Sequence, residues 1–177
     1  ADELKGIGAE KVSPGHRGVG FFGDRRILWR ANIESRIANR ILVPVAEFPA
    51  QNRDELYDGV ARVKWNRWFE VDQTIAVDAS SHKSAFQHTG FIAQVAKDGI
   101  CDVFRKMTGQ RPSVHKTKPD VRINIRLDRD RCLVSLDSSG ERLHRRGYRL
   151  SAGDAPLKET LAAGILRRLG YHRGVTL

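Results

Sequence analysis

The chain has 177 residues, of which 40% are hydrophobic and 29% charged, and its formal net charge is +10. These values exclude a disordered protein and predict one medium domain or two small ones, with a basic surface suited to a polyanionic partner. The apolar runs are too short to span a membrane, nothing resembles a signal peptide, and two distant cysteines make no disulfide framework, so we expect a cytoplasmic protein without a membrane partner.

The chain begins abruptly. Residues Ala1–Lys5 have the composition of the last turns of a helix, closed by Gly6 and Gly8. Most domains do not begin inside a helix, so we expect that a segment upstream is missing. The segment Val19–Phe22 is then predicted to form a strand that ends at a Gly23-Asp24 turn.

A helix and a strand follow. The segment Arg25–Ala38 is predicted to be helical because large apolar residues recur at positions i, i+4 and i+8. These residues are Trp29, Ile33 and Ile37. The segment Arg40–Phe48 is predicted to be a strand, and since Pro44 cannot donate to a sheet ladder, we expect it at a sheet edge or crossing between sheets. Residues 49–52 are expected to join two domains.

The middle of the chain predicts two helices around a strand. The segment Asn52–Lys64 is expected to form a helix capped by its first residue. The segment Thr74–Ala79 is predicted to be a strand, and Ser80–Gln87 a polar loop. A long helix is predicted over Thr89–Met107, with a broad apolar face, and Gly109 is expected to end it.

The clearest strand pattern lies in Val121–Leu127, where apolar residues alternate with arginine and asparagine. The segment Cys132–Asp137 is predicted to return as its hairpin partner. The last expected element is a helix over Ala155–Leu169, with Asp154 as its N-cap.

Several familiar motifs can be set aside. The segment Gly18–Gly23 matches G-x-G-x-x-G, but its glycines lie in a strand-like run, so no dinucleotide site is expected. The six histidines are scattered without ligand spacing, and no metal site is predicted. Cys101 and Cys132 both lie on apolar faces and are expected to be core residues. No catalytic residue is assigned.

Basic residues are concentrated late in the chain, where Arg111–Leu150 contains eleven Lys/Arg against five Asp/Glu, a surplus of six. Arginine provides forked donors for phosphate, and Tyr148 provides a ring on which a base could stack. The alternatives are a solvated face, or arginines paired with carboxylates at a domain joint. The candidate RNA-binding residues are Lys83, Arg111, Lys116, Lys118, Arg122, Arg126, Arg145, Arg146 and Arg149.

Three segments carry a family resemblance: Asp78–Phe91, Val95–Asp102 and Leu136–Arg149, the last running into Ala155–Ala163. The most specific parts are Leu-His-Arg-Arg-Gly-Tyr-Arg at 143–149 and Ala-Pro-Leu-Lys-Glu at 155–159. Over nearly its whole length the chain resembles the THUMP-containing methyltransferases that modify the exocyclic amine of guanine in bacterial large-subunit rRNA.

The resemblance implies an α+β fold. Its parts would be a truncated ferredoxin-like domain at 1–50, an α/β THUMP domain at 51–153, and a connecting helix at 154–177 that leads to a Rossmann-like methyltransferase domain absent from this chain. The partners implied are RNA, rRNA before tRNA, and the methyltransferase domain of the same parent chain.

The sequence departs from the family pattern at both ends. The family has a strand before the first helix, and none is seen here. The chain also stops where a Gly-rich loop for S-adenosylmethionine would begin, and it lacks the later Asn/Asp-Pro-Pro-Tyr/Phe tetrapeptide. We therefore expect the parent protein to use S-adenosylmethionine, and this chain to bind no cofactor and transfer no methyl group.

Three other functions stay open. The chain could be a stand-alone THUMP adaptor that assists a separate enzyme. Its parent could instead be an adenine-specific DNA methylase, since such enzymes share the Pro-Pro tetrapeptide. An enzyme with an unrecognised site is the weakest alternative, because no acid–base cluster supports it.

Orientation can also be predicted for the two basic stretches. Arg111, Lys116 and Lys118 are expected to face solvent in a loop between a helix and a strand. In Leu143–Arg149, a hinge between THUMP and catalytic domains, Gly147 is expected to adopt an angle that other residues disfavour, and Tyr148 to pack. The arginines at 145, 146 and 149 are expected to point outward.

Overall fold

The computed structural model describes the chain except for residues 16–17, 150, 152–153, 155 and 172–177. It divides into two compact units. The first unit contains Ala1–Ile41 together with Glu141–Leu177, and the second contains Leu42–Gly140. No helix among the described residues is long and apolar enough to cross a membrane.

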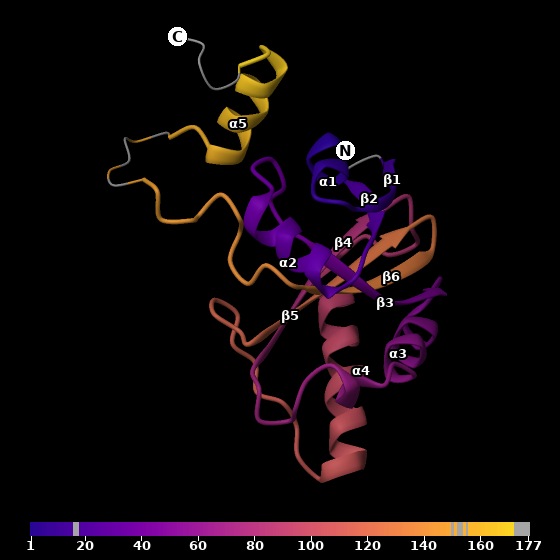
Figure 1. Cartoon of the computed structure of the whole chain (residues 1–177). Coiled ribbons are helices and arrows are strands. Elements are labelled where there is room, and N and C mark those ends of the chain that lie inside the picture. Colours follow the sequence, from indigo (N-terminus) through magenta and orange to yellow (C-terminus); the bar gives the residue numbers. More distant parts are fainter. Residues whose placement is uncertain (16–17, 150, 152–153, 155, 172–177) are drawn as a thin grey trace. The chain divides into compact units, whose positions relative to one another are not determined.

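The first unit combines three helices with a β-hairpin (Figure 1). Its elements are α1 (Asp2–Gly6), β1 (Glu10–Pro14), β2 (Val19–Phe22), α2 (Arg25–Glu34) and α5 (Glu159–Arg168). Strands β1 and β2 pair antiparallel. Helix α2 begins where the carboxylate of Asp24 accepts a hydrogen bond from the backbone N–H of Ile27 at 2.9 Å. A small core forms around Leu4, Ile7, Ala31 and Ile41.

Two elements of this unit differ from what the sequence predicts. Strand β1 was not predicted, because four of its five residues are exposed and only Val12 is half-buried, so the pattern has no apolar face. Helix α2 ends at Glu34 instead of Ala38, because the backbone of Ser35 is extended. The apolar stripe that predicted the helix does not face a core either: Trp29 is 60% exposed and Ile33 is 72% exposed.

The last helix starts later than predicted. The expected first residue, Ala155, lies outside the described residues, but α5 begins only at Glu159, after an extended Lys158. Asp154 therefore does not cap it. The Arg149 guanidinium donates a 2.6 Å hydrogen bond to the carbonyl of Leu157, which stabilises a non-helical path before the helix.

The second unit contains a four-stranded sheet in the order β3-β6-β5-β4. The strands are β3 (Leu42–Pro49), β4 (Ile75–His82), β5 (Val121–Asp128) and β6 (Arg131–Asp137). Strands β4 and β5 are parallel, and the other pairs are antiparallel. Helices α3 (Arg53–Ala61) and α4 (Thr89–Thr108) pack with the sheet around one core, beside the 3-10 turn η1 (Trp65–Arg67) (Figure 1).

The predicted alternation of β5 is confirmed. Ile123, Ile125 and Leu127 are fully buried under the helices, while the alternate residues Arg122, Asn124 and Arg126 lie on the other face of the sheet. The hairpin to β6 is also confirmed, and its turn residues Arg129 and Asp130 both have positive φ, as a two-residue hairpin turn requires.

Most element limits in this unit match the predictions. Strand β3 lies at a sheet edge, with an irregularity after Pro44. The side chain of Asn52 caps α3 by accepting from the N–H of Glu55 at 3.0 Å. Gly109 ends α4 with a φ of 76°. One prediction is wrong: β4 continues to His82, so the expected loop at 80–87 is partly strand.

Candidate nucleic-acid interface

Residues 110–118 form a loop, the basic loop, that is anchored to the start of β4. The N–H of Ile75 donates to the carbonyl of Ser113 at 2.8 Å, and the N–H of His115 donates to the carbonyl of Ile75 at 3.0 Å. Asp120 closes the loop, since its carboxylate accepts from both the N–H and the hydroxyl of Thr74. These hydrogen bonds lower the pKa of Asp120. The loop is therefore fixed at both ends.

Within this loop, two lysines face solvent as predicted. The imidazole Nδ1 of His115 accepts a 3.0 Å hydrogen bond from the N–H of Lys118, which folds the segment into a tight turn. Lys116 and Lys118 are both exposed, and neither forms an ion pair with a carboxylate in the described part of the chain. Their positive charges are available to a partner.

Arg111 differs from these lysines. Its guanidinium lies 3.8 Å from the carboxylate of Asp98 and 3.7 Å from that of Asp102, both on α4, and its side chain is 38% exposed. Arg111 is exposed as expected, but the acidic residues of α4 draw its guanidinium toward the helix. Its charge is partly compensated within the second unit.

The two β5 arginines form ion pairs on the sheet face opposite the helices. Arg122 contacts Asp78 at 3.0 Å, and its side chain is only 16% exposed. Arg126 contacts Asp128 at 3.2 Å, beside His82 on β4. The hydrogen bond from His82, with that from Arg126, lowers the pKa of the Asp128 carboxyl. An RNA phosphate would have to compete with carboxylates for both arginines.

Lys83 lies immediately after β4, at the end of the strand far from the basic loop. It is exposed with a φ of 49°, and it forms no ion pair with the carboxylates that the structure describes. The neighbouring loop is fixed, because Asp130 accepts a 2.8 Å hydrogen bond from the N–H of Ala85. At about 3.3 Å per strand residue, roughly 20–25 Å separates Lys83 from the basic loop.

The second basic stretch belongs to the first unit, and there the outward orientation of Arg146 is wrong. Its guanidinium donates to four carbonyl oxygens. Three of them lie around the end of α2, and the fourth lies in the turn that contains Arg146 itself. The acceptors are Asn32 at 2.8 Å, Ile33 at 2.6 Å, Ser35 at 2.7 Å and Leu143 at 2.9 Å. The last carbonyls of a helix lack intrahelical donors, and Arg146 supplies them.

The neighbours of Arg146 also depart from expectation. Arg149 pairs with Glu159 at 3.1 Å instead of pointing freely outward. Tyr148 does not pack, because 77% of it is exposed. Arg145 is exposed as expected. The prediction for Gly147 is confirmed, since its φ of 77° lies in the region that favours glycine.

Both cysteines lie in the core of the second unit. Cys101 and Cys132 are buried, as expected for core residues. Burial raises the pKa of the Cys132 thiol to about 12, and it also raises that of Cys101. Among the described residues, no three His, Cys, Asp or Glu side chains are grouped as metal ligands.

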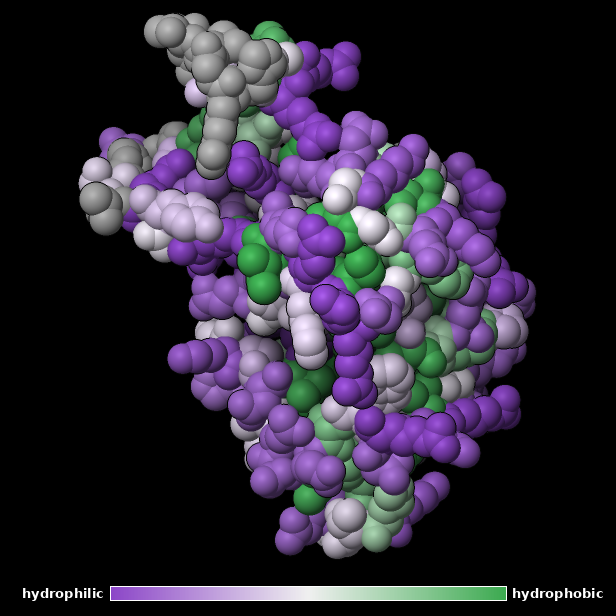
Figure 2. All heavy atoms as spheres, viewed as in Figure 1, coloured by the Kyte–Doolittle hydropathy of each residue, from purple (hydrophilic) through white to green (hydrophobic). Residues whose placement is uncertain are grey.

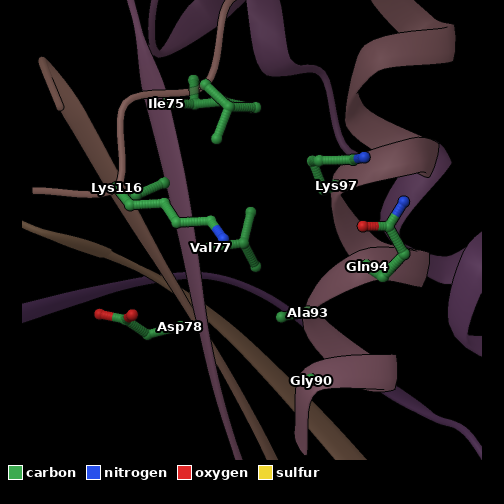
Figure 3. Close-up of a pocket in the computed structure, with 10 residues that line it drawn as sticks. Ile75, Val77, Asp78, Gly90, Ala93, Gln94, Lys97 and Lys116 are labelled. Atoms are coloured by element: carbon green, nitrogen blue, oxygen red, sulfur yellow. The ribbon is translucent and has the colours of Figure 1, made fainter.

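A cleft between α4 and β4 was missed by sequence reasoning (Figure 3). Its volume is about 320 Å³, and Gly90 and Ala93 of α4 leave the space opposite β4. Two lysines, Lys97 and Lys116, lie at its border. The signal in the sequence was a run of small residues at three-residue spacing on α4, which are Gly90, Ala93, Ala96 and Gly99.

Comparison with known proteins identifies the fold. Residues 50–137 match the THUMP domain. This part of the chain belongs to the THUMP-domain family. Residues 1–42 match the RlmL ferredoxin-like domain, so both parts of the fold implied by the resemblance are shown.

The curated relatives are much longer than this chain. The "Ribosomal RNA large subunit methyltransferase K/L" of Methylococcus capsulatus is 50% identical over 169 residues, which cover 96% of this chain and 23% of that protein. The protein of the same name from Syntrophotalea carbinolica is 45% identical, over 97% and 24%. This chain therefore spans about a quarter of their length.

Solved structures give the same result. A protein described as "SMU.472, a putative methyltransferase complexed with SAH" is 28% identical with a TM-score of 0.83, over 98% of this chain and 46% of that one. A Listeria monocytogenes protein described as a predicted N6-adenine-specific DNA methylase is 28% identical with a TM-score of 0.81, over 94% and 43%. This chain thus aligns with less than half of each of these two proteins.

Proposed function

We propose that this chain is the RNA-docking portion of an S-adenosylmethionine-dependent rRNA methyltransferase. The proposal rests on one observation: this chain contains a THUMP domain and is 50% identical to part of a large-subunit rRNA methyltransferase. The exposed lysines on a fixed loop of that domain add the chemistry, because ammonium groups bind phosphate oxygens. In the parent protein, methyl transfer would belong to a separate domain that binds S-adenosylmethionine.

The RNA-contacting residues that we propose fall into two groups. Lys83, Lys116 and Lys118 of the second unit and Arg145 of the first are exposed and would bind phosphates directly. The remaining candidates already have partners in the fold, so their contacts with RNA would be secondary. These are Arg111, Arg122, Arg126, Arg146 and Arg149. Figure 2 shows a mostly hydrophilic surface with small, separate apolar patches, which suits a solvated nucleic-acid interface.

Two rivals differ in substrate or in context. The likeness to a protein described as a DNA methylase favours duplex DNA as the second candidate ligand. Competition binding separates the two ligands. Folded rRNA fragments and duplex DNA of equal length are compared as competitors that displace the bound chain. We expect RNA to displace at lower concentration, and preferential displacement by DNA would overturn the proposal. A stand-alone adaptor would show the same RNA preference in a parent without a methyltransferase domain.

The basic loop gives the proposal a residue-level test. The variant Lys116→Ala/Lys118→Ala removes two exposed charges from one turn, and Lys5→Ala/Lys64→Ala removes two exposed lysines elsewhere as a charge-matched control. We expect the loop variant to weaken RNA binding by roughly ten-fold and the control by much less, with unchanged melting temperatures. Equal losses for both pairs would show that the loop is not part of the interface.

A further inference from the structure

The cleft between α4 and β4 is small, partly apolar and bordered by cations. Figure 3 shows Ile75 and Val77 on β4 facing Ala93 and Gln94 on α4 across the open space. The cleft volume of about 320 Å³ lies at the small end of ligand cavities. It suits one small, flat group rather than a helix or a duplex.

The strand side of the cleft exposes hydrogen-bonding backbone. Strand β4 is an edge strand, because its only partner in the sheet is β5. The N–H and C=O of Ile75 point away from β5 and bond to the basic loop, so by alternation those of Val77 and Ala79 also point outward. No backbone partner for these two residues is present in the described part of the chain.

The helix and loop sides of the cleft supply positive charge. Lys97 of α4 lies 3.0 Å from Asp98, and its side chain is 26% exposed. Lys116 of the basic loop has no carboxylate partner among the described residues, and its side chain extends toward Val77 in Figure 3. The only carboxylate on the border, Asp78, already pairs with Arg122. The border of the cleft is therefore suited to bind an anion.

We propose that this cleft binds a single unpaired nucleotide of the RNA. Its base would lie against Val77 and Ala93 and hydrogen-bond to the open backbone of β4, while Lys116 and Lys97 bind its phosphate. An unpaired base presents adjacent donors and acceptors on its Watson–Crick edge, which a paired base does not. The inference rests on the proposed function and adds which structural feature of the RNA is recognised.

An added peptide strand is the rival occupant, and the structure disfavours it. Strand addition needs several consecutive outward residues on an edge. Here Ile75 is already bonded to the loop, and at the other end the hydroxyl of Ser81 donates to the carbonyl of Phe86 at 2.7 Å. Val77 and Ala79 lie between these two loop attachments, which leaves space for a base but hinders the approach of a long strand.

The test compares two RNA stems that differ by one bulged nucleotide. We expect the unmodified chain to bind the bulged stem about five-fold more tightly or better, since one or two hydrogen bonds distinguish the stems. Amide resonances of Val77 and Ala79 should shift with the bulged stem alone. The variant Ala93→Leu fills the cleft and should bring the affinity ratio to about one while leaving binding to the plain stem unchanged.

The controls separate the possible failures. Ala85→Leu adds the same side chain on an exposed loop and should keep the preference for the bulge. If both stems bind but the ratio is the same in Ala93→Leu as in the unmodified chain, the cleft assignment is wrong and RNA docking stands. If neither stem binds, the proposed function itself fails. Shifts of Val77 with an acidic extended hexapeptide, and none with RNA, would assign the cleft to a protein strand.

Discussion

At the scale of single residues, chemically equal arginines have different roles. Arg145 and Arg146 are adjacent in one basic stretch, yet the first is exposed and the second donates to four backbone carbonyls. Sequence alone could not distinguish them, because three of the four acceptors lie more than a hundred positions away, around the end of α2. A basic run therefore identified the region but not the residue that contacts a partner.

The role of Arg146 leads to a stability prediction. Replacing it in Arg146→Ala leaves the carbonyls at the end of α2 without a protein donor, so we expect a loss of about 2 kcal/mol. For a chain of this size, that loss lowers the melting temperature by roughly 4–8 °C. Thermal melts followed by circular dichroism measure the change.

The adjacent residue supplies the control. Arg145→Ala removes an exposed side chain and should alter stability by no more than about 0.5 kcal/mol. Arg146→Lys should recover little, because one ammonium cannot reproduce the planar fork that reaches several carbonyls. Equal melting curves for Arg145→Ala and Arg146→Ala would contradict the capping role.

The buried thiols give a chemical prediction. The raised pKa of Cys132, at about 12, keeps its thiol protonated at pH 8, and burial blocks access to both cysteines. A colorimetric thiol reagent at pH 8 should therefore label neither cysteine in the folded chain and both after unfolding in urea. Stoichiometric labelling of the folded chain would show that the core around Cys132 is open.

At the scale of elements, patterns with one clear burial face were predicted well. Strand β5 and helix α4 have regular apolar faces, and the structure buries most of each, although Phe91 and Met107 near the ends of α4 are exposed. Strand β1 was missed because almost all its residues are exposed, and the start of α5 was misplaced because its local contacts favour an extended path. In both cases tertiary or local hydrogen bonding, not hydrophobic periodicity, determines the backbone.

Close approach of α3 to β3 depends on one glycine. A Cβ atom at Gly59 would overlap the ring of Phe48. Gly59→Ala gains about 1 kcal/mol of helix propensity but overpacks this contact, so we expect a net loss of roughly 1–2 kcal/mol in urea unfolding. Adding Phe48→Leu should restore part of the loss. A Gly59→Ala chain more stable than its parent would show that Phe48 moves aside freely.

At the scale of the whole molecule, the charge surplus predicted a polyanionic partner but overestimated how many basic side chains are free to bind it. Much of the surplus in Arg111–Leu150 is compensated by ion pairs with carboxylates outside that segment, which are Asp78, Asp98, Asp102 and Glu159. A count of charges within the segment cannot detect these partners. The cleft beside β4 was unpredictable for the same reason, because it arises only when a helix with small residues packs beside an open strand edge.

The central claim is that exposed lysines of the THUMP domain bind RNA phosphates. The measurement that tests it most directly is the slope of log affinity against log salt concentration for a structured RNA. Each lysine–phosphate contact contributes about 0.7–0.9 to that slope, so Lys83→Ala/Lys116→Ala/Lys118→Ala should reduce its magnitude by roughly 2 with the melting temperature unchanged. A slope near zero in the unmodified chain, or an identical slope in the triple variant, would contradict the account.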